Sequence, residues 1–419
     1  MPTHLISNHR YKVARIEQTE TPEMMKDRNR SAGRGAAAKV VSREICSILS
    51  KGTRTFCHLD DLTVLDDSLT GDSSSILMSI CEQLLGSDDS NDQESPAVVE
   101  YGICIVNSVL CTVTLAQFED DRMRNRLRTL ICRYSPTEVL LEHNATTNET
   151  LGVLQLLAPK ASREMLYADE MPPAELVPQW IQKAKYFSHS PSSGEADHYP
   201  LVLQAALGAL SDGESRLVIR SLGGALWHLK RCCIDFEVMS HGRIFAYVPP
   251  DTETSTADDA LFTNITTPTE YDTTQDSLLS ASDGTSSPLP IDSSPRHMIL
   301  DAVTLTNLEI LVNNFDHTPR GSLYSFMNRC RTPFGKRLLK EWICKPLIRP
   351  ADIQNRMEAV SELMDDFSSE SEAARSLLKT CPDLERLLSR VHSNGSLLSH
   401  PYFHLTSLRY QQAAAEPSR

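Results

Sequence analysis

The sequence predicts a multidomain protein in which an α/β part is followed by an all-α part. Two observations predict this order. Strand-like, β-branched stretches alternate with helical stretches up to about residue 250, and from residue 298 onward the apolar spacing is helical. Between them, residues 251–297 carry nine acidic residues and one arginine among Ser, Thr and Pro, a composition that cannot offset its ordering entropy and predicts disorder.

The N-terminal stretch predicts one strand and two helices. YKVARIEQ (residues 11–18) alternates like a strand. TPEMMKDR opens a helix with Thr21 as N-cap and Pro22 at the first helical position. KVVSREICSILSKGT (residues 39–53) places its apolar residues on one helical face, so a second helix is expected there.

The next hundred residues predict an α/β layer. Residues 60–98 are rich in Asp and Ser and indicate a surface loop, with a short helix around 76–85. YGICIVNSVLCTVTLAQF (residues 101–118) is interrupted by polar residues and predicts two paired strands that turn near Asn107 and Ser108, not a membrane span. A helix capped by Asp120 or Asp121, the strand TEVLLE and a helix from Thr146 or Thr147 follow.

Helices dominate the remainder. In residues 214–233, ESRLVIRSLGGALWHLKRCC, the pair Gly223-Gly224 costs helix stability, so another backbone is expected to approach closely there. After the acidic segment, helices are predicted at 300–315, 322–330, 333–344, 350–366, 368–380 and 382–392.

Charge and cysteine usage narrow the class of protein. The sequence has 41 Lys+Arg against 55 Asp+Glu, a net charge of −14, which excludes a positive potential over the whole protein surface. Any contact with nucleic acid must therefore be confined to a small part of the surface. The 11 cysteines form no CxxC pair and predict a reduced, intracellular chain. Histidines such as His58, His228 and His392 stand singly and are expected to be packed or solvated, not metal ligands.

The helix at residues 333–344 is predicted to pack against the protein with one side and to expose the other side to solvent. Thr332 caps it, Pro333 fits its first turn, and Pro346 disfavours its continuation. At 100° per residue, one apolar face gathers Phe334, Gly335, Leu338, Leu339, Trp342 and Ile343, with Gly335 open to a neighbouring helix. The opposite side carries Glu341 and three candidates for weak phosphate contacts, Lys336, Arg337 and Lys340.

Catalytic motifs are missing from the sequence. There is no GxxxxGK[ST] phosphate loop, GxSxG, HExxH or kinase-like set, so no catalytic, cofactor-binding or metal-binding residue is predicted. A metal-dependent nuclease on the α/β layer is a remote alternative, because its strand centre carries the neutral Asn107. Its candidate carboxylates are Glu100, Glu119, Asp120, Asp121 and Glu142.

Several stretches, in order and over most of residues 10–395, together resemble the MutS family of DNA mismatch-repair proteins, most of all the eukaryotic homologues that read the mismatch within a heterodimer. The stretches are YKVARIEQTETPEMM, REICSILSKGT, YGICIVN, FEDDRMRNRLRTLICRY, SLGGALWHLKRCCID, ILDAVTLTNLEILVN, TPFGKRLLKEWICKPL with IQNRMEAVSEL, and PDLERLLSRVH.

The resemblance implies a division into domains and a role for the helix at 333–344, which becomes a structural relay in the lever framework. The implied domains are the end of the mismatch-binding domain (1–45), a ribonuclease-H-like connector (46–250, with an acidic loop at 60–98), the acidic insert (251–297) and the start of the helical core/lever domain (298–419).

The chain also departs from the family pattern. The mismatch-reading Phe-x-Glu motif is missing, since no Phe is followed two residues later by Glu. The family's clamp helices and ATPase would follow residue 400. Cys111 stands where a turn glycine is expected in the hairpin. A connector/lever fragment is therefore expected, unable to hydrolyse ATP and without specific mismatch recognition.

By resemblance, the full-length family is nuclear, binds mismatched double-stranded DNA, uses ATP and Mg, pairs with a second MutS homologue and contacts a MutL-type protein through the connector. For this chain a structural and relay role is expected, and no cofactor. The alternative is a stand-alone interaction module that binds MutL- or MutS-type partners.

Overall fold

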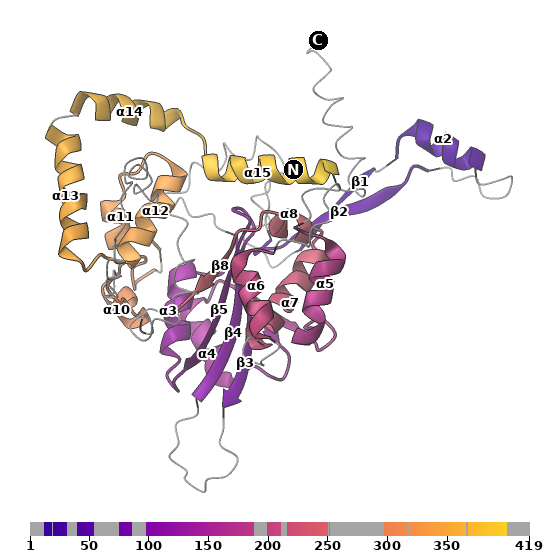
Figure 1. Cartoon of the computed structure of the whole chain (residues 1–419), viewed down its shortest axis with the longest axis horizontal. Helices are drawn as coiled ribbons and strands as arrows, with labels where there is room; N and C mark the ends of the chain where they lie inside the picture. Colours follow the sequence, from indigo (N-terminus) through magenta and orange to yellow (C-terminus); the bar gives the residue numbers. More distant parts are fainter. Residues whose placement is uncertain are drawn as a thin grey trace, which may run out of the picture.

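The chain folds into a two-stranded hairpin, a six-stranded sheet with helices on both faces, and a set of helices toward the C-terminus (Figure 1). The predicted acidic insert, apart from Asp251 and His297, and most of the predicted loop at 60–98 lie outside the described residues. The computed structural model describes residues 12–18, 20–31, 40–53, 75–85, 98–187, 199–210, 216–249, 251, 297–316, 318–365 and 368–399.

The hairpin consists of β1 (Val13–Gln18) and β2 (Arg43–Leu49), joined through α2 (Pro22–Ser31). The predicted strand and first helix are confirmed, and the Thr21 hydroxyl accepts a hydrogen bond from the Met24 N–H at 3.3 Å. The helix predicted at 39–53 is wrong, because residues 43–49 form a strand that pairs antiparallel with β1. Its β-branched residues also suit a strand, and the partner strand outweighs the helical spacing.

The sheet has the strand order β7-β6-β3-β4-β5-β8. Strands β3, β4 and β5 pair antiparallel with one another. Strand β6 pairs parallel with β3 and with β7, and β8 pairs parallel with β5. The strand pair predicted at 101–118 and the strand TEVLLE are confirmed as β4, β5 and β6. The strands are β3 (Ile76–Leu85), β4 (Val98–Asn107), β5 (Thr112–Asp120), β6 (Glu138–Glu142), β7 (Ser162–Leu166) and β8 (Ile244–Tyr247).

A central strand was predicted as a helix. Residues 76–85 form β3, which pairs with β4 on one side and β6 on the other. Its first seven residues are all buried, because helices cover both faces of the sheet. A strand buried on both faces has no apolar–polar alternation, so its sequence does not distinguish it from a buried helix.

Two layers of helices enclose the sheet (Figure 1). Residues of α3 and α4 share one buried apolar cluster with the sheet, and residues of α5 to α8 share the other. The helices predicted after Asp120 or Asp121, from Thr146 or Thr147 and at 214–233 are confirmed as α3, α4 and α7, but α3 begins only at Asn125 and its N-cap residue is Arg124, so the predicted cap is wrong. The helices are α3 (Asn125–Tyr134), α4 (Asn148–Leu157), η3 (Ala174–Leu176), α5 (Val177–Ala184), α6 (Leu201–Ala209), α7 (Arg216–Arg231) and α8 (Asp235–Met239).

Helix α7 lies directly against the backbone of β4. A Cβ atom on Gly102 would lie 2.1 Å from the carbonyl carbon of Leu217, so only glycine allows this approach. The backbone contact predicted at Gly223-Gly224 is wrong in kind. A Cβ atom on Gly223 would meet side-chain atoms of Val177 and Pro172 at 2.7 and 2.8 Å, and one on Gly224 would meet the Met171 sulfur at 2.5 Å.

The C-terminal part is helical, as predicted, although its first two helices are shorter than expected. Within the described ranges, no helix is both long and apolar enough to cross a membrane. The helices are α10 (Ala302–Asn307), α11 (Leu323–Met327), α12 (Pro333–Cys344), α13 (Pro350–Asp365), α14 (Ser368–Thr380) and α15 (Leu384–Ser399).

Candidate functional site: two joints between the parts of the chain

Helix α12, predicted as a relay, begins and ends as its sequence indicates. The Thr332 hydroxyl accepts a hydrogen bond from the Gly335 N–H at 3.2 Å, and Pro333 is the first helical residue. A Cβ atom on Gly335 would lie 2.8 Å from that same hydroxyl. The glycine therefore makes room for the cap of its own helix, and the expectation that another helix approaches there is wrong.

The apolar side of α12 is only partly covered. Leu339 and Ile343 pack against a small buried cluster formed by Leu305, Ile310, Leu311 and Tyr324. Phe334 and Leu338 are half-buried, whereas Trp342 keeps 44% of its surface exposed. The Arg356 guanidinium lies 4.0 Å from the centre of the Trp342 ring, a cation–π contact that covers part of it. The packed face of α12 is therefore shared between apolar contacts and a charged one.

Arg337 was predicted on the solvent-exposed side of α12, but its side chain is largely buried. Its guanidinium donates two parallel hydrogen bonds to the carboxylate of Asp383, at 2.7 and 2.8 Å, and two more to Glu385 at 2.6 and 2.9 Å. The side chain of Arg337 is 17% exposed and that of Asp383 is 6% exposed. Burial opposes ionisation of Asp383, but the bonds from Arg337 outweigh it and lower the pKa of that carboxyl. Lys336 and Lys340 are half-buried.

The Arg337 contacts join the start of α12 to the start of α15. Between them the chain runs outward through α13 and α14 and returns, so the ion pairs close a loop of helices (Figure 1). One turn further along α12, on the same side as Arg337, the Glu341 carboxylate lies 3.6 Å from the Arg133 guanidinium of α3 in the sheet domain. Helix α10 adds a hydrogen bond of 3.0 Å from the Ala302 N–H to the Thr129 hydroxyl of α3.

Helix α15 makes its own contacts with the sheet domain. The Ser389 hydroxyl donates to the Leu110 carbonyl at 3.2 Å, and the Ser389 carbonyl lies 3.0 Å from Nε2 of His241. The ring centroids of His241 and His392 are 4.2 Å apart. Together with the α12 contacts, these make the first joint, between the sheet domain and the C-terminal helices.

The second joint lies between the N-terminal hairpin and the sheet. Residues 50–53 follow β2 and turn over Glu138, the first residue of β6. The Ser50 hydroxyl and the Gly52 N–H, the latter at 2.9 Å, both donate to the Glu138 carboxylate. A Cβ atom on Gly52 would lie 2.7 Å from the Glu138 Cβ, so this turn requires glycine. The Lys51 carbonyl accepts hydrogen bonds from Ser75 and Thr137.

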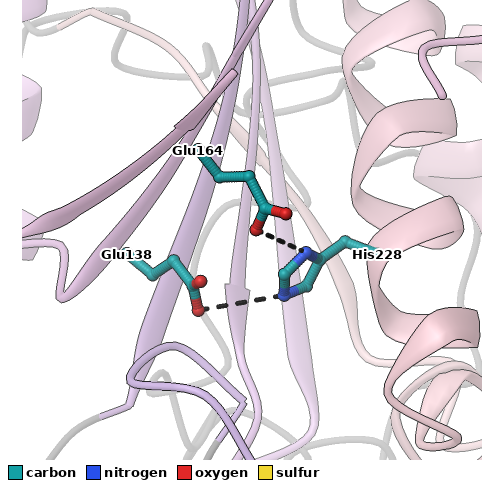
Figure 2. A group of neighbouring side chains, drawn as sticks. All are labelled: Glu138, Glu164 and His228. Carbon is teal, nitrogen blue, oxygen red and sulfur yellow. Dashed lines mark ion pairs between the residues drawn. The ribbon is translucent and has the colours of Figure 1, made fainter. Parts of the chain in front are cut away.

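A cluster of two carboxylates and one imidazole lies beneath this turn (Figure 2). His228 of α7 points between Glu138 of β6 and Glu164 of β7, and we call these three residues the Glu–Glu–His cluster. Nε2 of His228 is 3.8 Å from a Glu138 oxygen, and Nδ1 is 3.5 Å from a Glu164 oxygen. His228 and Glu138 are 0% and 1% exposed, and Glu164 is 21% exposed. His228 is packed, as one of the two predicted alternatives has it, but it lies between two carboxylates.

The charges of the cluster are balanced from outside it. Glu164 accepts hydrogen bonds from Lys12, at 2.6 Å, and from Arg231. Burial opposes ionisation of Glu164, but these bonds outweigh it and lower the pKa of the carboxyl. Burial lowers the pKa of His228 to about 4, against the pull of the two carboxylates. The ring is therefore neutral near pH 7 and offers a lone pair.

The candidate nuclease residues do not converge. The Asn107 side-chain oxygen accepts from the N–H groups of Val109 and Leu110, both at 3.1 Å, and so holds the β4–β5 turn. Asp120 accepts from the backbone N–H groups of Arg126 and Leu127 in the first turn of α3 and from that of Asp121, and Asp121 accepts from that of Asn125. Glu100 binds Gln117, Glu142 pairs with Arg220, and the Glu119 carbonyl accepts from Arg126. Contacts at the start of α3, the β4–β5 turn and side-chain pairing thus account for the side chains of Asn107, Asp120, Asp121, Glu100 and Glu142.

Three family models match the chain in order, and together they cover the N-terminal hairpin, four strands of the sheet and most of the helices. MutS domain I matches residues 3–56, MutS domain II matches 93–241, and MutS domain III matches 303–416. The chain belongs to the MutS family. None of these matches is to an ATPase domain, in line with the missing phosphate-loop motif.

Curated Msh6 proteins are similar over nearly the whole chain, and a bacterial MutS is similar over about a quarter of it. DNA mismatch repair protein Msh6 of Homo sapiens is 34% identical over 404 residues, which is 93% of this chain and 26% of that protein. Msh6 of Gallus gallus is 33% identical over 402 residues, 93% of the chain and 27% of that protein. MutS of Borrelia hermsii is 46% identical over 101 residues, 24% of the chain and 12% of that protein. The chain spans about a quarter of the Msh6 proteins.

In terms of the MutS domain models, the second joint connects domain I to domain II. Sequence reasoning missed its cluster because the strand that carries Glu164 was not predicted. Once β7 is placed parallel to β6, the register sets Glu164 beside Leu140, two residues from Glu138 and on the same face of the sheet. His228 on the buried face of α7 then lies opposite both carboxylates.

Proposed function

We propose that this chain carries out the DNA mismatch-repair role that its relatives are named for, as the connector and lever framework of a MutS-type protein. The observation that carries the proposal is the placement of α12, which is tied to α15 by Arg337 and to α3 by Glu341. A displacement of the C-terminal helices would reach the sheet domain through these two charged contacts. The order of the three family models supports the assignment.

Finer parts of the proposal rest on the resemblance together with the strand order. Three antiparallel strands followed on one side by two parallel ones, β5-β4-β3-β6-β7, support a ribonuclease-H-like connector. We propose that the protein acts in the nucleus, as one subunit of a heterodimer with a second MutS homologue. Mismatched DNA and a MutL-type protein are its proposed partners, and ATP with Mg would belong to the family's ATPase domain.

The test is a titration of this chain with matched and mismatched DNA duplexes over a series of salt concentrations. Weak, salt-sensitive binding without preference for the mismatch is expected, because the Phe-x-Glu motif is missing from the sequence. Replacing both Lys336 and Lys340 by Gln should reduce the slope of log affinity against log salt by at most about 2.

The matched control is the pair Lys183→Gln and Lys185→Gln, at the far end of α5, which removes the same net charge. An equal loss in both double variants would show a general charge effect and would contradict contacts at α12. A clear preference for mismatched duplex, or ATP hydrolysis by the purified chain, would overturn the connector and lever assignment.

A further inference from the structure

The Glu–Glu–His cluster contains a buried ring that its protein neighbours do not satisfy. Neither nitrogen of His228 makes a hydrogen bond, although the side chain is completely buried. A buried polar group without a hydrogen bond costs about 1–3 kcal/mol, so such groups call for an explanation. In the part of the chain that the structure describes, this is also the one group of three residues that offers donor atoms within 4.8 Å of one another.

We infer that the cluster is a binding site for a divalent transition-metal ion, with Glu138, Glu164 and one ring nitrogen of His228 as ligands. The site goes beyond the proposed function, which needs no metal in this part of the chain.

The distances between the donor atoms fit an ion better than a hydrogen bond. The two nitrogen–oxygen distances are 3.5 and 3.8 Å. Both exceed the roughly 2.7–3.2 Å of an N–H···O bond. Two ligands that are each about 2.0–2.2 Å from a tetrahedral ion lie roughly 3.4 Å apart. The two carboxylates face different ring nitrogens, so an ion held by one nitrogen requires the carboxylate at the other to move toward it, and the three donor atoms already lie within 4.8 Å of one another.

The chemistry of the donors indicates zinc. A neutral imidazole and carboxylate oxygens are zinc ligands in proteins, whereas magnesium and calcium take oxygen ligands alone. The supporting contacts are also in place, since Ser50 and Gly52 donate to Glu138 and Arg231 donates to Glu164. Hydrogen bonds of this kind orient ligand carboxylates.

Lys12 marks the side from which an ion would enter. Its side chain is 39% exposed and its ammonium lies 2.6 Å from a Glu164 oxygen, the same atom that lies near His228. An ammonium and a metal ion compete for this oxygen, because both are cations. Lys12 therefore holds the position that zinc would take, and zinc binding would move it outward.

The experiment is a calorimetric titration of the metal-free full chain with Zn²⁺, repeated with Co²⁺ to record its visible absorption. One ion per chain is expected, with the absorption of a four-coordinate site. His228→Gln and Glu164→Gln should each weaken binding roughly 100-fold or more. Lys12→Gln should tighten it several-fold, because it removes the competing cation.

Two controls separate this site from adventitious binding by other histidines and cysteines. His143→Gln removes an exposed histidine that stacks on Tyr167, and Cys232→Ser removes the thiol one turn after His228. Both variants should retain the wild-type affinity. Circular dichroism checks that each variant is folded, and Glu164→Gln is the decisive one because Glu164 lies at the sheet edge.

The inference is overturned if the wild-type chain binds no Zn²⁺, or if the folded Glu164→Gln chain binds it with unchanged affinity and stoichiometry. Weaker binding by Lys12→Gln would equally contradict it. These results leave the proposed function standing, because DNA titrations do not depend on zinc at this cluster.

Discussion

The six-stranded sheet and the C-terminal helices hold their positions in different ways. In β4, Tyr101, Ile103 and Cys104 are fully buried, and apolar clusters cover both faces of the sheet. On α13 and α14, by contrast, Met357 and Leu377 keep 60% and 74% of their surface exposed. The C-terminal helices are instead joined by charged and polar contacts at a few places, above all at Arg337.

The difference indicates two kinds of stability. Apolar burial contributes about 25 cal/mol per Å² over the whole sheet, so its loss at one position is felt by the entire domain. An ion pair acts only between the two elements that it joins, so its loss should open one contact and leave the rest folded. Substitutions in the two regions should therefore differ in how far their effects spread.

The largest effect is expected at the backbone contact between β4 and α7. Gly102→Ala should lower the free energy of unfolding of the sheet domain by about 3 kcal/mol, because the added methyl group would overlap the backbone of Leu217. Urea denaturation followed by the fluorescence of Trp180 and Trp227 measures this. Gly152→Ala on α4 is the control, since no atom lies within 4 Å of its added Cβ. It should be neutral or stabilising by up to about 1 kcal/mol.

A smaller and local effect is expected from Arg337→Gln. The substitution leaves the buried Asp383 carboxylate with Arg386, whose Nε lies 3.1 Å from it, so the cost should be about 2 kcal/mol. Amide hydrogen exchange in α12 and α15 should accelerate roughly 30-fold, since each factor of ten corresponds to about 1.4 kcal/mol. Tryptophan fluorescence of the sheet domain should keep its denaturation midpoint.

The control for Arg337 is Arg375→Gln, which removes an exposed pair with Glu372 on α14. Its effect should stay within about 0.5 kcal/mol. If Arg337→Gln shifted the unfolding of the sheet domain as much as Gly102→Ala does, the distinction between the two regions would be wrong.

The smallest effect concerns pH at the contact between α15 and α8. Burial lowers the pKa of His241 below its ordinary 6.5, and the neighbouring His392 and Arg243 lower it further. The docked state therefore binds fewer protons than the undocked state, so docking weakens as the pH falls below about 6.5. Amide exchange in α15, corrected for its intrinsic pH dependence, should accelerate by less than about tenfold between pH 7 and 5.5. In His241→Gln this acceleration should be lost, and an unchanged response would assign it to other groups.

Local signals in the sequence predicted the start of α12 and the β4–β5 turn, because those depend on neighbours along the chain. Thr332 and Pro333 start α12 as expected. Cys111, found where a turn glycine was expected, has a φ of 52°, in the left-handed region. Contacts between distant segments were not predictable in this way. Strand β2 depends on its pairing with β1, and the Glu–Glu–His cluster depends on β7, which carries no strong strand pattern.

The hydrogen bond from Ser389 to Leu110 joins residues that are 279 positions apart. During synthesis, the carbonyl of Leu110 leaves the ribosome long before its partner exists, and the entropic cost of closing so large a loop must be met by structure that is already formed. We therefore expect the β4–β5 turn to form before α15 docks, and the docking of α15 to be among the last steps of folding. A chain that had not yet reached that step would have a folded sheet domain with α15 undocked.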